Sequence, residues 1–170
     1  MATLLLLVRH GPAEVRDPIT WPDDAKRPLT KEGRRGTRQA ARALDKLKIR
    51  PQLIATSPAV RSKVTAEILF DELRPKRPIA VWPELGPDEA PEPVLARVGR
   101  LGGGKGPVIV VGHEPQLGEL LGLSMMHDAI SVARLAKAGA ALIHFPSSVA
   151  PGAGRIEWLL TRSQLVRLSE

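Results

Sequence analysis

The stretch "LLLLVRHGPAE", residues 4–14, joins five consecutive apolar residues to an arginine, a histidine and a glycine. An apolar run of this length, bounded by a Gly-Pro turn, indicates a central strand of a parallel sheet that is covered on both faces. Burial of the strand does not require a cation and an imidazole at its end. The residues that follow this strand are therefore candidates for function.

The chain has 170 residues, no cysteine and a formal net charge of +7. This length predicts one domain over residues 1–170, and the lack of cysteine excludes disulfides, thiol catalysis and thiolate metal sites. No segment approaches the roughly 20 apolar residues of a membrane span. The N-terminal apolar run is too short for a signal peptide. We expect a soluble, cytoplasmic protein with no membrane partner.

The excess of basic residues suits an anionic partner, although a solvated, arginine-rich surface explains the charge more simply. We do not expect nucleic acid as the partner, because only 3% of the residues are aromatic and base stacking needs aromatic side chains. The basic residues are also spread along the chain. Composition predicts no oligomeric state.

Six apolar runs recur along the chain, and helical patterns lie between most of them. This alternation predicts an α/β fold with three layers, α/β/α, and a mainly parallel sheet of about six strands. The last two runs leave no room for a helix, so the loop "FPSSVAPGAGR" predicts a hairpin with one antiparallel edge strand. The predicted strands are 4–8, 52–56, 79–82, 108–111, 140–145 and 156–160, and the predicted helices are 31–47, 60–73, 91–101 and 116–126.

Three of the predicted strands end in polar side chains. The first ends in Arg9 and His10, the second leads into a helix whose first turn holds Arg61, and the fourth ends at His113. Carboxyl ends of parallel strands meet at one edge of a sheet. Two guanidiniums match phosphate oxygens, a histidine can form a covalent intermediate, and Gly11 leaves room for a substrate. The set predicts phosphoryl transfer to an imidazole.

A metal site is the competing interpretation of two neighbouring histidines. Few carboxylates lie near them in the sequence, and two arginines would repel a divalent cation. We therefore expect no metal and no cofactor.

Several motifs together resemble the histidine phosphatase superfamily, which has the phosphoglycerate mutase-like fold, and in particular its short SixA-type phosphohistidine phosphatases. The resemblance extends over nearly the whole chain. The motifs are "VRHG" at 8–11, "RPLTKEG" at 27–33, "SPAVRSKVTAE" at 57–67, "PEL" at 83–85 and "VGHEP" at 111–115.

The resemblance implies a role for each residue that matches. His10 would be the nucleophile that becomes phosphorylated, and Arg9 and Arg61 would hold the phosphoryl oxygens. His113 would be the second imidazole, which hydrogen-bonds the phosphoryl group. Because a nucleophile must be neutral and this donor is best charged, the two imidazoles are expected in opposite protonation states.

Substrate-binding roles are expected for Gly11, Arg27, Ser57 and Glu84. The family's middle motif often reads Arg-Ala-x-Gln-Thr, and this chain keeps the threonine, as Thr65, but not the glutamine.

The larger enzymes of the family supply a carboxylate general acid after the third strand. Glu84, Asp88 and Glu89 lie in this region, but none fits that motif. An alkoxide needs a proton donor to leave, whereas a phosphohistidine leaves as neutral imidazole. Together with the few residues available for a lid, this favours a phosphorylated protein, carrying phosphohistidine, as substrate. The alternatives are a small-molecule phosphomonoesterase and a non-catalytic phosphate- or nucleic-acid-binding module.

Overall fold

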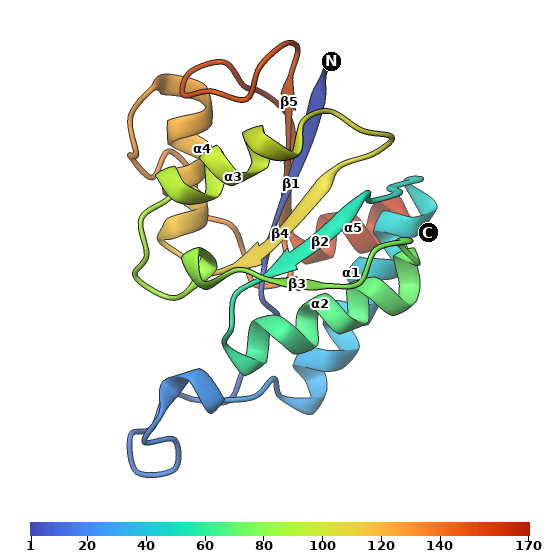
Figure 1. Ribbon diagram of the computed structural model, residues 1–170. Helices are drawn as coiled ribbons and strands as arrows, with labels where there is room; N and C mark the ends of the chain where they lie inside the picture. Colours follow the sequence, from blue (N-terminus) through green and yellow to red (C-terminus); the bar gives the residue numbers. More distant parts are fainter.

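A six-stranded sheet separates two layers of helices in the computed structural model, which describes residues 1–170 (Figure 1). The predicted three-layer α/β/α architecture is therefore confirmed. The strand order is β3-β2-β4-β1-β5-β6. The strands are β1 (Thr3–Arg9), β2 (Leu53–Thr56), β3 (Ala80–Val81), β4 (Val108–Gly112), β5 (Ala140–Phe145) and β6 (Arg155–Leu160).

Four of the strands, β1 to β4, run parallel to one another. The other side of β1 pairs with β5 in the antiparallel direction, and β5 pairs with β6 in the same way. The antiparallel pair predicted at the sheet edge is thus confirmed. The one strand that runs antiparallel to all the others is β5, the inner member of that pair. The edge strand, β6, therefore runs in the same direction as β1.

The four predicted helices are confirmed to within one residue at each end. The structure adds a fifth helix and two short 3₁₀ turns that the sequence patterns did not reveal. None of the helices combines the length and the apolar content needed to cross a lipid bilayer. The helices are α1 (Lys31–Lys46), α2 (Val60–Leu73), α3 (Glu92–Leu101), α4 (Gln116–Met126) and α5 (Arg162–Leu168), and the 3₁₀ turns are η1 (Asp24–Lys26) and η2 (Pro83–Leu85).

The apolar run of β1 is buried on both faces, as its composition indicates. Leu5 and Leu7 belong to the core beneath α3 and α4, whereas Leu6 and Val8 belong to the core beneath α1, α2 and α5. Figure 1 shows these two helix layers on opposite faces of the sheet. Because β1 lies between β4 and β5, its backbone is also hydrogen-bonded on both edges. The end of this strand is therefore held rigidly.

Helix α5 completes the core beneath one face of the sheet. It begins at a capping box, in which Thr161 and Gln164 satisfy each other's backbone N–H groups. Leu165 is fully buried, whereas Leu168, one turn later, is 60% exposed. The helix has only seven residues, so its stability comes from packing rather than from its own hydrogen bonds.

We therefore expect Leu165→Ala to lower the free energy of unfolding by about 2–5 kcal/mol, the usual range for truncating a buried leucine. Leu168→Ala is the matched control in the same helix and should change it by less than about 0.5 kcal/mol. Urea unfolding followed by circular dichroism measures both. Equal effects of the two substitutions would show that α5 does not contribute to the core.

Candidate active site

A cavity of about 530 Å³ lies at the carboxyl ends of β1 and β4 and at the start of α2, the helix that follows β2. Its walls include Arg9, His10, Arg61 and His113, the four residues that the sequence analysis placed at strand ends, and also Arg27. Backbone hydrogen bonds join the three strand ends: the His10 N–H donates to the Gly112 carbonyl, and the Ser57 N–H to the Val111 carbonyl. The parallel pairing thus brings residues that are distant in sequence into one site.

His10 is 6% exposed and follows the last residue of β1. Its Nδ1 atom lies 2.7 Å from the carbonyl oxygen of Gly11. A carbonyl can only accept, so Nδ1 carries the proton of the neutral imidazole and Nε2 keeps a lone pair. Burial, reinforced by the charges of Arg61 and Arg9, lowers the pKa of His10 to about 4. The imidazole is therefore unprotonated at Nε2 at neutral pH.

Gly11 has a packing role instead of the substrate clearance that we expected. A side chain at this position would overlap Thr37 and approach the Gly33 carbonyl, both on α1. Gly11 is not among the residues that line the cavity, and its N–H donates to Thr65 Oγ1 at 3.0 Å. The glycine lets α1 approach the end of β1, and the threonine of the middle motif holds the backbone beside His10.

Arg61 lies in the first turn of α2, and only 3% of it is exposed. Its Nη1 donates to the backbone carbonyl of Asp24 at 2.8 Å, and its Nη2 lies 3.1 Å from the Asp24 carboxylate. The same carboxylate accepts from Arg27 Nε at 2.8 Å, and this bond is the main reason why the pKa of Asp24 is lowered. Asp24, which the sequence analysis missed, therefore holds both arginines at the cavity wall.

Arg9 is the last residue of β1 and also lines the cavity. Its Nη1 donates to the Leu135 carbonyl at 2.9 Å. The Nε atoms of Arg9 and Arg61 are both buried without a hydrogen-bond partner. Buried charged donors are normally satisfied, and a phosphoryl group would provide acceptors for guanidiniums in this arrangement.

Glu114 is a carboxylate that the sequence analysis left outside the site, although it follows His113 directly. It lines the cavity, and its Oε1 accepts from the Leu135 N–H at 2.9 Å. Burial raises the pKa of Glu114, and Arg9 nearby opposes the rise. This side chain therefore gains a proton more readily than an exposed glutamate does.

His113 faces His10, with the two ring centroids 5.1 Å apart and the planes inclined by 56°. Burial, with His10 and Arg61 as neighbours, lowers the pKa of His113 to about 3. Without a bound substrate, both imidazoles are therefore neutral at pH 7. Our expectation of opposite protonation states is wrong for this form of the protein. The reason is that burial and the arginines disfavour a second positive charge.

Ser57 acts on His113 and does not line the cavity. Its Oγ lies 2.8 Å from His113 Nε2, and Ser62 Oγ lies 3.3 Å from the same nitrogen. Ser57 also accepts from the Ala59 N–H at the start of α2. Its hydroxyl therefore orients the second imidazole, in place of the substrate contact that we expected.

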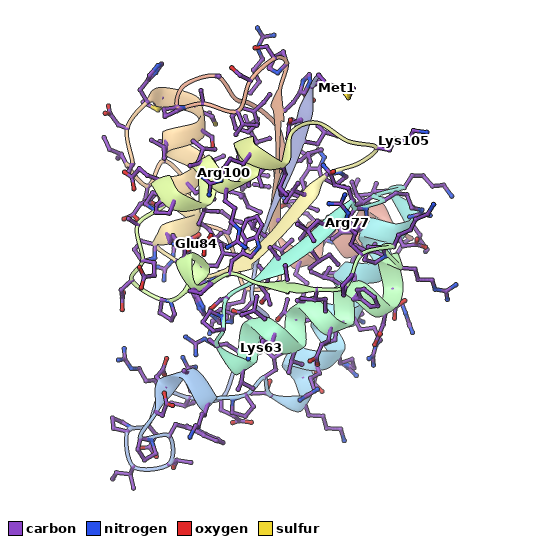
Figure 2. All side chains as sticks on the ribbon, in the orientation of Figure 1. Met1, Lys63, Arg77, Glu84, Arg100 and Lys105 are labelled. Carbon is purple, nitrogen blue, oxygen red and sulfur yellow. The ribbon has the colours of Figure 1, made fainter.

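Glu84 also lies outside the cavity. Its carboxylate accepts from Arg97 Nη1 at 2.7 Å, and the Arg97 guanidinium stacks over Trp82 at 4.4 Å from the ring centroid. Figure 2 shows Glu84 beside the helix layer of α3. Of the three acidic residues considered after the third strand, Asp88 alone lines the cavity.

The structure contains no cluster of three or more histidine, cysteine, aspartate and glutamate side chains with the spacing to hold a metal ion. Four arginines and Lys137 line the cavity with four carboxylates, and the guanidiniums of Arg9 and Arg61 lie close enough to lower the pKa of both imidazoles. Guanidiniums suit an anion.

Comparisons with known proteins agree with this geometry. The sequence model of the histidine phosphatase superfamily, branch 1, matches residues 5–86. An uncharacterised protein of Picosynechococcus sp. (strain PCC 7002) is 33% identical over 126 residues, which is 68% of this chain and 68% of that protein. The structure of the protein histidine phosphatase SixA complexed with tungstate has a TM-score of 0.83 and 25% identity, over 96% of this chain and 99% of that chain.

Two more distant structures share the fold. A protein of Agrobacterium tumefaciens, described as a SixA phosphohistidine phosphatase, has a TM-score of 0.74 and 21% identity, over 94% of this chain and 97% of that chain. A mycobacterial glucosyl-3-phosphoglycerate phosphatase has a TM-score of 0.68 and 16% identity, over 92% and 98%. The match to the superfamily model, the 33% identical relative and the similarity to the SixA structure together show that the chain belongs to the histidine phosphatase superfamily, in its SixA-type branch, and is a hydrolase that uses a histidine nucleophile.

Proposed function

We propose that this protein is a phosphatase that forms a covalent phosphohistidine on His10 and acts on phosphohistidine in a protein substrate. The observation that carries the proposal is the hydrogen bond from His10 Nδ1 to the Gly11 carbonyl. It leaves a neutral Nε2 at the wall of a cavity that also holds Arg9 and Arg61. A nucleophile therefore lies beside the donors that would bind a phosphoryl group.

In the first step, the Nε2 lone pair of His10 attacks phosphorus, and the bond from phosphorus to the substrate's imidazole nitrogen breaks. Arg9 and Arg61 hold the phosphoryl oxygens as charge develops on them. The substrate imidazole leaves neutral when its other nitrogen carries a proton. His10 keeps its own proton on Nδ1, which goes on donating its hydrogen bond to the Gly11 carbonyl.

In the second step, water attacks phosphorus and the bond from phosphorus to His10 Nε2 breaks. The electrons of that bond return to Nε2, and both protons of the water remain on the product, dihydrogen phosphate. His10 regains its starting protonation state without a proton transfer. His113 is held at Nε2 by Ser57, and its ring centroid lies 5.1 Å from that of His10. It is therefore a polar neighbour of the reacting groups in both steps.

A protein substrate is supported by the surroundings of the cavity. Val15, which lines it, is 82% exposed, and Ile19 on the same segment is 90% exposed. This segment before η1 projects away from the sheet (Figure 1). Exposed apolar side chains beside an anion site favour a macromolecular surface over a small, highly charged metabolite. The similarity to the protein histidine phosphatase SixA supports the same substrate class.

Hydrolysis of a small phosphate ester is a second candidate, favoured by Glu114. This glutamate lines the cavity and burial raises its pKa, so it is the group best placed to protonate a leaving alkoxide. The mycobacterial glucosyl-3-phosphoglycerate phosphatase is a phosphatase of a small molecule with this fold. Rates on a phosphohistidine protein and on an alkyl phosphate, compared in one assay, decide between the two substrates.

The nucleophile is tested by labelling the protein with a phosphohistidine donor in EDTA, followed by alkaline quenching and peptide mapping. We expect one phosphoryl group, on the peptide that contains His10. His10→Ala should remain unlabelled, whereas His113→Ala should still accept a label. A label on the His113 peptide, or labelling that persists in His10→Ala, would overturn the assignment, and an unlabelled wild-type protein that binds phosphate would instead indicate a binding module.

The guanidinium of Arg61 is tested with Arg61→Lys. Lysine keeps the charge but loses the paired donors that contact Asp24 and the phosphoryl group, so kcat should fall on the order of 100-fold or more. Glu84→Gln is the matched control, because its ion pair with Arg97 lies outside the cavity, and its kcat should stay close to that of the wild type. Similar activity of Arg61→Lys and wild type would place Arg61 outside the catalytic machinery.

The protonation state of His10 gives a pH prediction. Its pKa is lowered to about 4, so Nε2 stays unprotonated as the pH falls from 7.5 to about 5.5, where an ordinary histidine of pKa about 6.5 would gain a proton. The imidazole carbon-bound proton signals of His10 and His113, assigned in NMR spectra through the alanine variants, should not shift over this range. Titration of either signal with a midpoint near 6.5 would contradict the burial argument.

A further inference from the structure

A second cavity, of about 610 Å³, lies at the opposite end of the sheet from the active site. It is formed where β2 and β4 begin, whereas the active site lies where they end. Gln52 precedes β2, and its N–H donates to the carbonyl of Pro107, which precedes β4, at 3.0 Å. Figure 2 shows Arg77 and Lys105 at this end of the molecule, and Glu84 and Lys63 toward the other.

The walls of this cavity are strongly basic. Five of its eleven residues are arginine or lysine and none is acidic. Arg50 is paired with the Asp45 carboxylate at 2.7 Å, and the other four make no ion pair. Like charges gathered in one concave site raise the local potential and attract an anion. The cationic residues of the wall are Arg50, Arg74, Lys76, Arg77 and Lys105.

The loop "GGGKG", residues 102–106, adds backbone donors to the same wall. The N–H groups of Gly103, Gly104 and Lys105 donate to no acceptor in the protein. A side chain at Gly104 would overlap the Gln52 amide, whose Nε2 is buried without a partner. Successive free N–H groups in a turn form a concave site for phosphate oxygens.

The backbone at Arg74 provides an independent observation. Arg74 caps the C-terminus of α2 with a φ of 51°, in the left-handed region. Glycine is the usual residue at such a position, because a side chain is strained there. The Arg74 side chain lines the cavity. Arg74 is one of five non-glycine residues with a positive φ, and at this position its cation lines the cavity while glycine would relieve the backbone.

We infer that this second cavity binds a small polyanion with several linked phosphates. Its volume lies in the range of about 300–1,000 Å³ typical of small-ligand sites, and a concave wall suits a compact anion better than a duplex. No aromatic residue lines it, so a nucleobase would find no stacking surface. Recognition is therefore directed at the phosphate chain itself. This inference is independent of the function proposed for the other end of the sheet.

The test uses the full-length, ¹⁵N-labelled protein titrated with tripolyphosphate and observed by NMR. The amide signals of Gly103, Gly104 and Lys105 should shift and saturate, separately from the signal of Gly11 near the active site. Sulfate at the same ionic strength should not reproduce the saturation. ATP should bind within about tenfold of tripolyphosphate, because the base adds no contact. Shifts confined to the active site, equal shifts with sulfate, or much tighter binding of ATP would overturn the inference.

Two double variants provide the matched comparison. Arg74→Gly with Arg77→Ser should weaken tripolyphosphate binding at this cavity at least about tenfold, as expected when two charged donors are lost. Its melting temperature should stay the same or rise, because glycine relieves the left-handed backbone at position 74. Arg34→Ser with Arg35→Ser removes the same charge from the exposed face of α1 and should leave binding unchanged. Equal losses in the two double variants would mean that only net charge matters.

Discussion

The position of His10 depends on the burial of β1 in the middle of the sheet. This strand is hydrogen-bonded to β4 on one edge and to β5 on the other, and helices cover both of its faces. A strand held in this way cannot twist or slide at its end without breaking two ladders. The first residue beyond it therefore has a fixed place, and its imidazole can be oriented by a single hydrogen bond to the next carbonyl.

Burial also determines the electrostatics of the site. Two imidazoles, four arginines and Lys137 line one cavity together with four carboxylates. A charge on either ring would stand beside the guanidiniums of Arg9 and Arg61, which disfavour it. Both histidine pKa values are lowered, with burial as the largest cause. Asp24 offsets part of this charge while it holds Arg61 and Arg27 in place. The protein thus keeps its nucleophile neutral next to fixed cations, which is the arrangement that an incoming dianion requires.

Much of the fold could be predicted because its signals are local. Buried strands appear in the sequence as apolar runs. Because parallel strands end at the same edge of a sheet, the ends of β1, β2 and β4 could be predicted to lie together. Helix α5 was missed because seven residues give too short a periodic pattern. The sequence placed the antiparallel strand in the last hairpin. It could not show that this strand is β5 and not the edge strand β6, because that depends on pairing between β5 and β1, which are far apart in the sequence.

The site was predicted less completely, since side-chain partners depend on tertiary contacts. Nothing near Asp24 in the sequence shows that it meets Arg61, which is 37 residues away. The hydroxyl of Ser57 was predicted to contact the substrate, but it is hydrogen-bonded to Nε2 of His113. Glu84 was read as a site residue, yet Arg97 on α3 holds it outside the cavity.

The central claim is that the backbone carbonyl of Gly11 selects which nitrogen of His10 attacks phosphorus. The most direct measurement is the NMR spectrum of the trapped phosphoenzyme, with ³¹P and ¹⁵N labels in the imidazole, because one-bond coupling identifies the nitrogen joined to phosphorus. The account predicts phosphorylation at Nε2 of His10, with Nδ1 still protonated. Phosphorus bonded to Nδ1 would contradict it, since that nitrogen could not then donate to the Gly11 carbonyl.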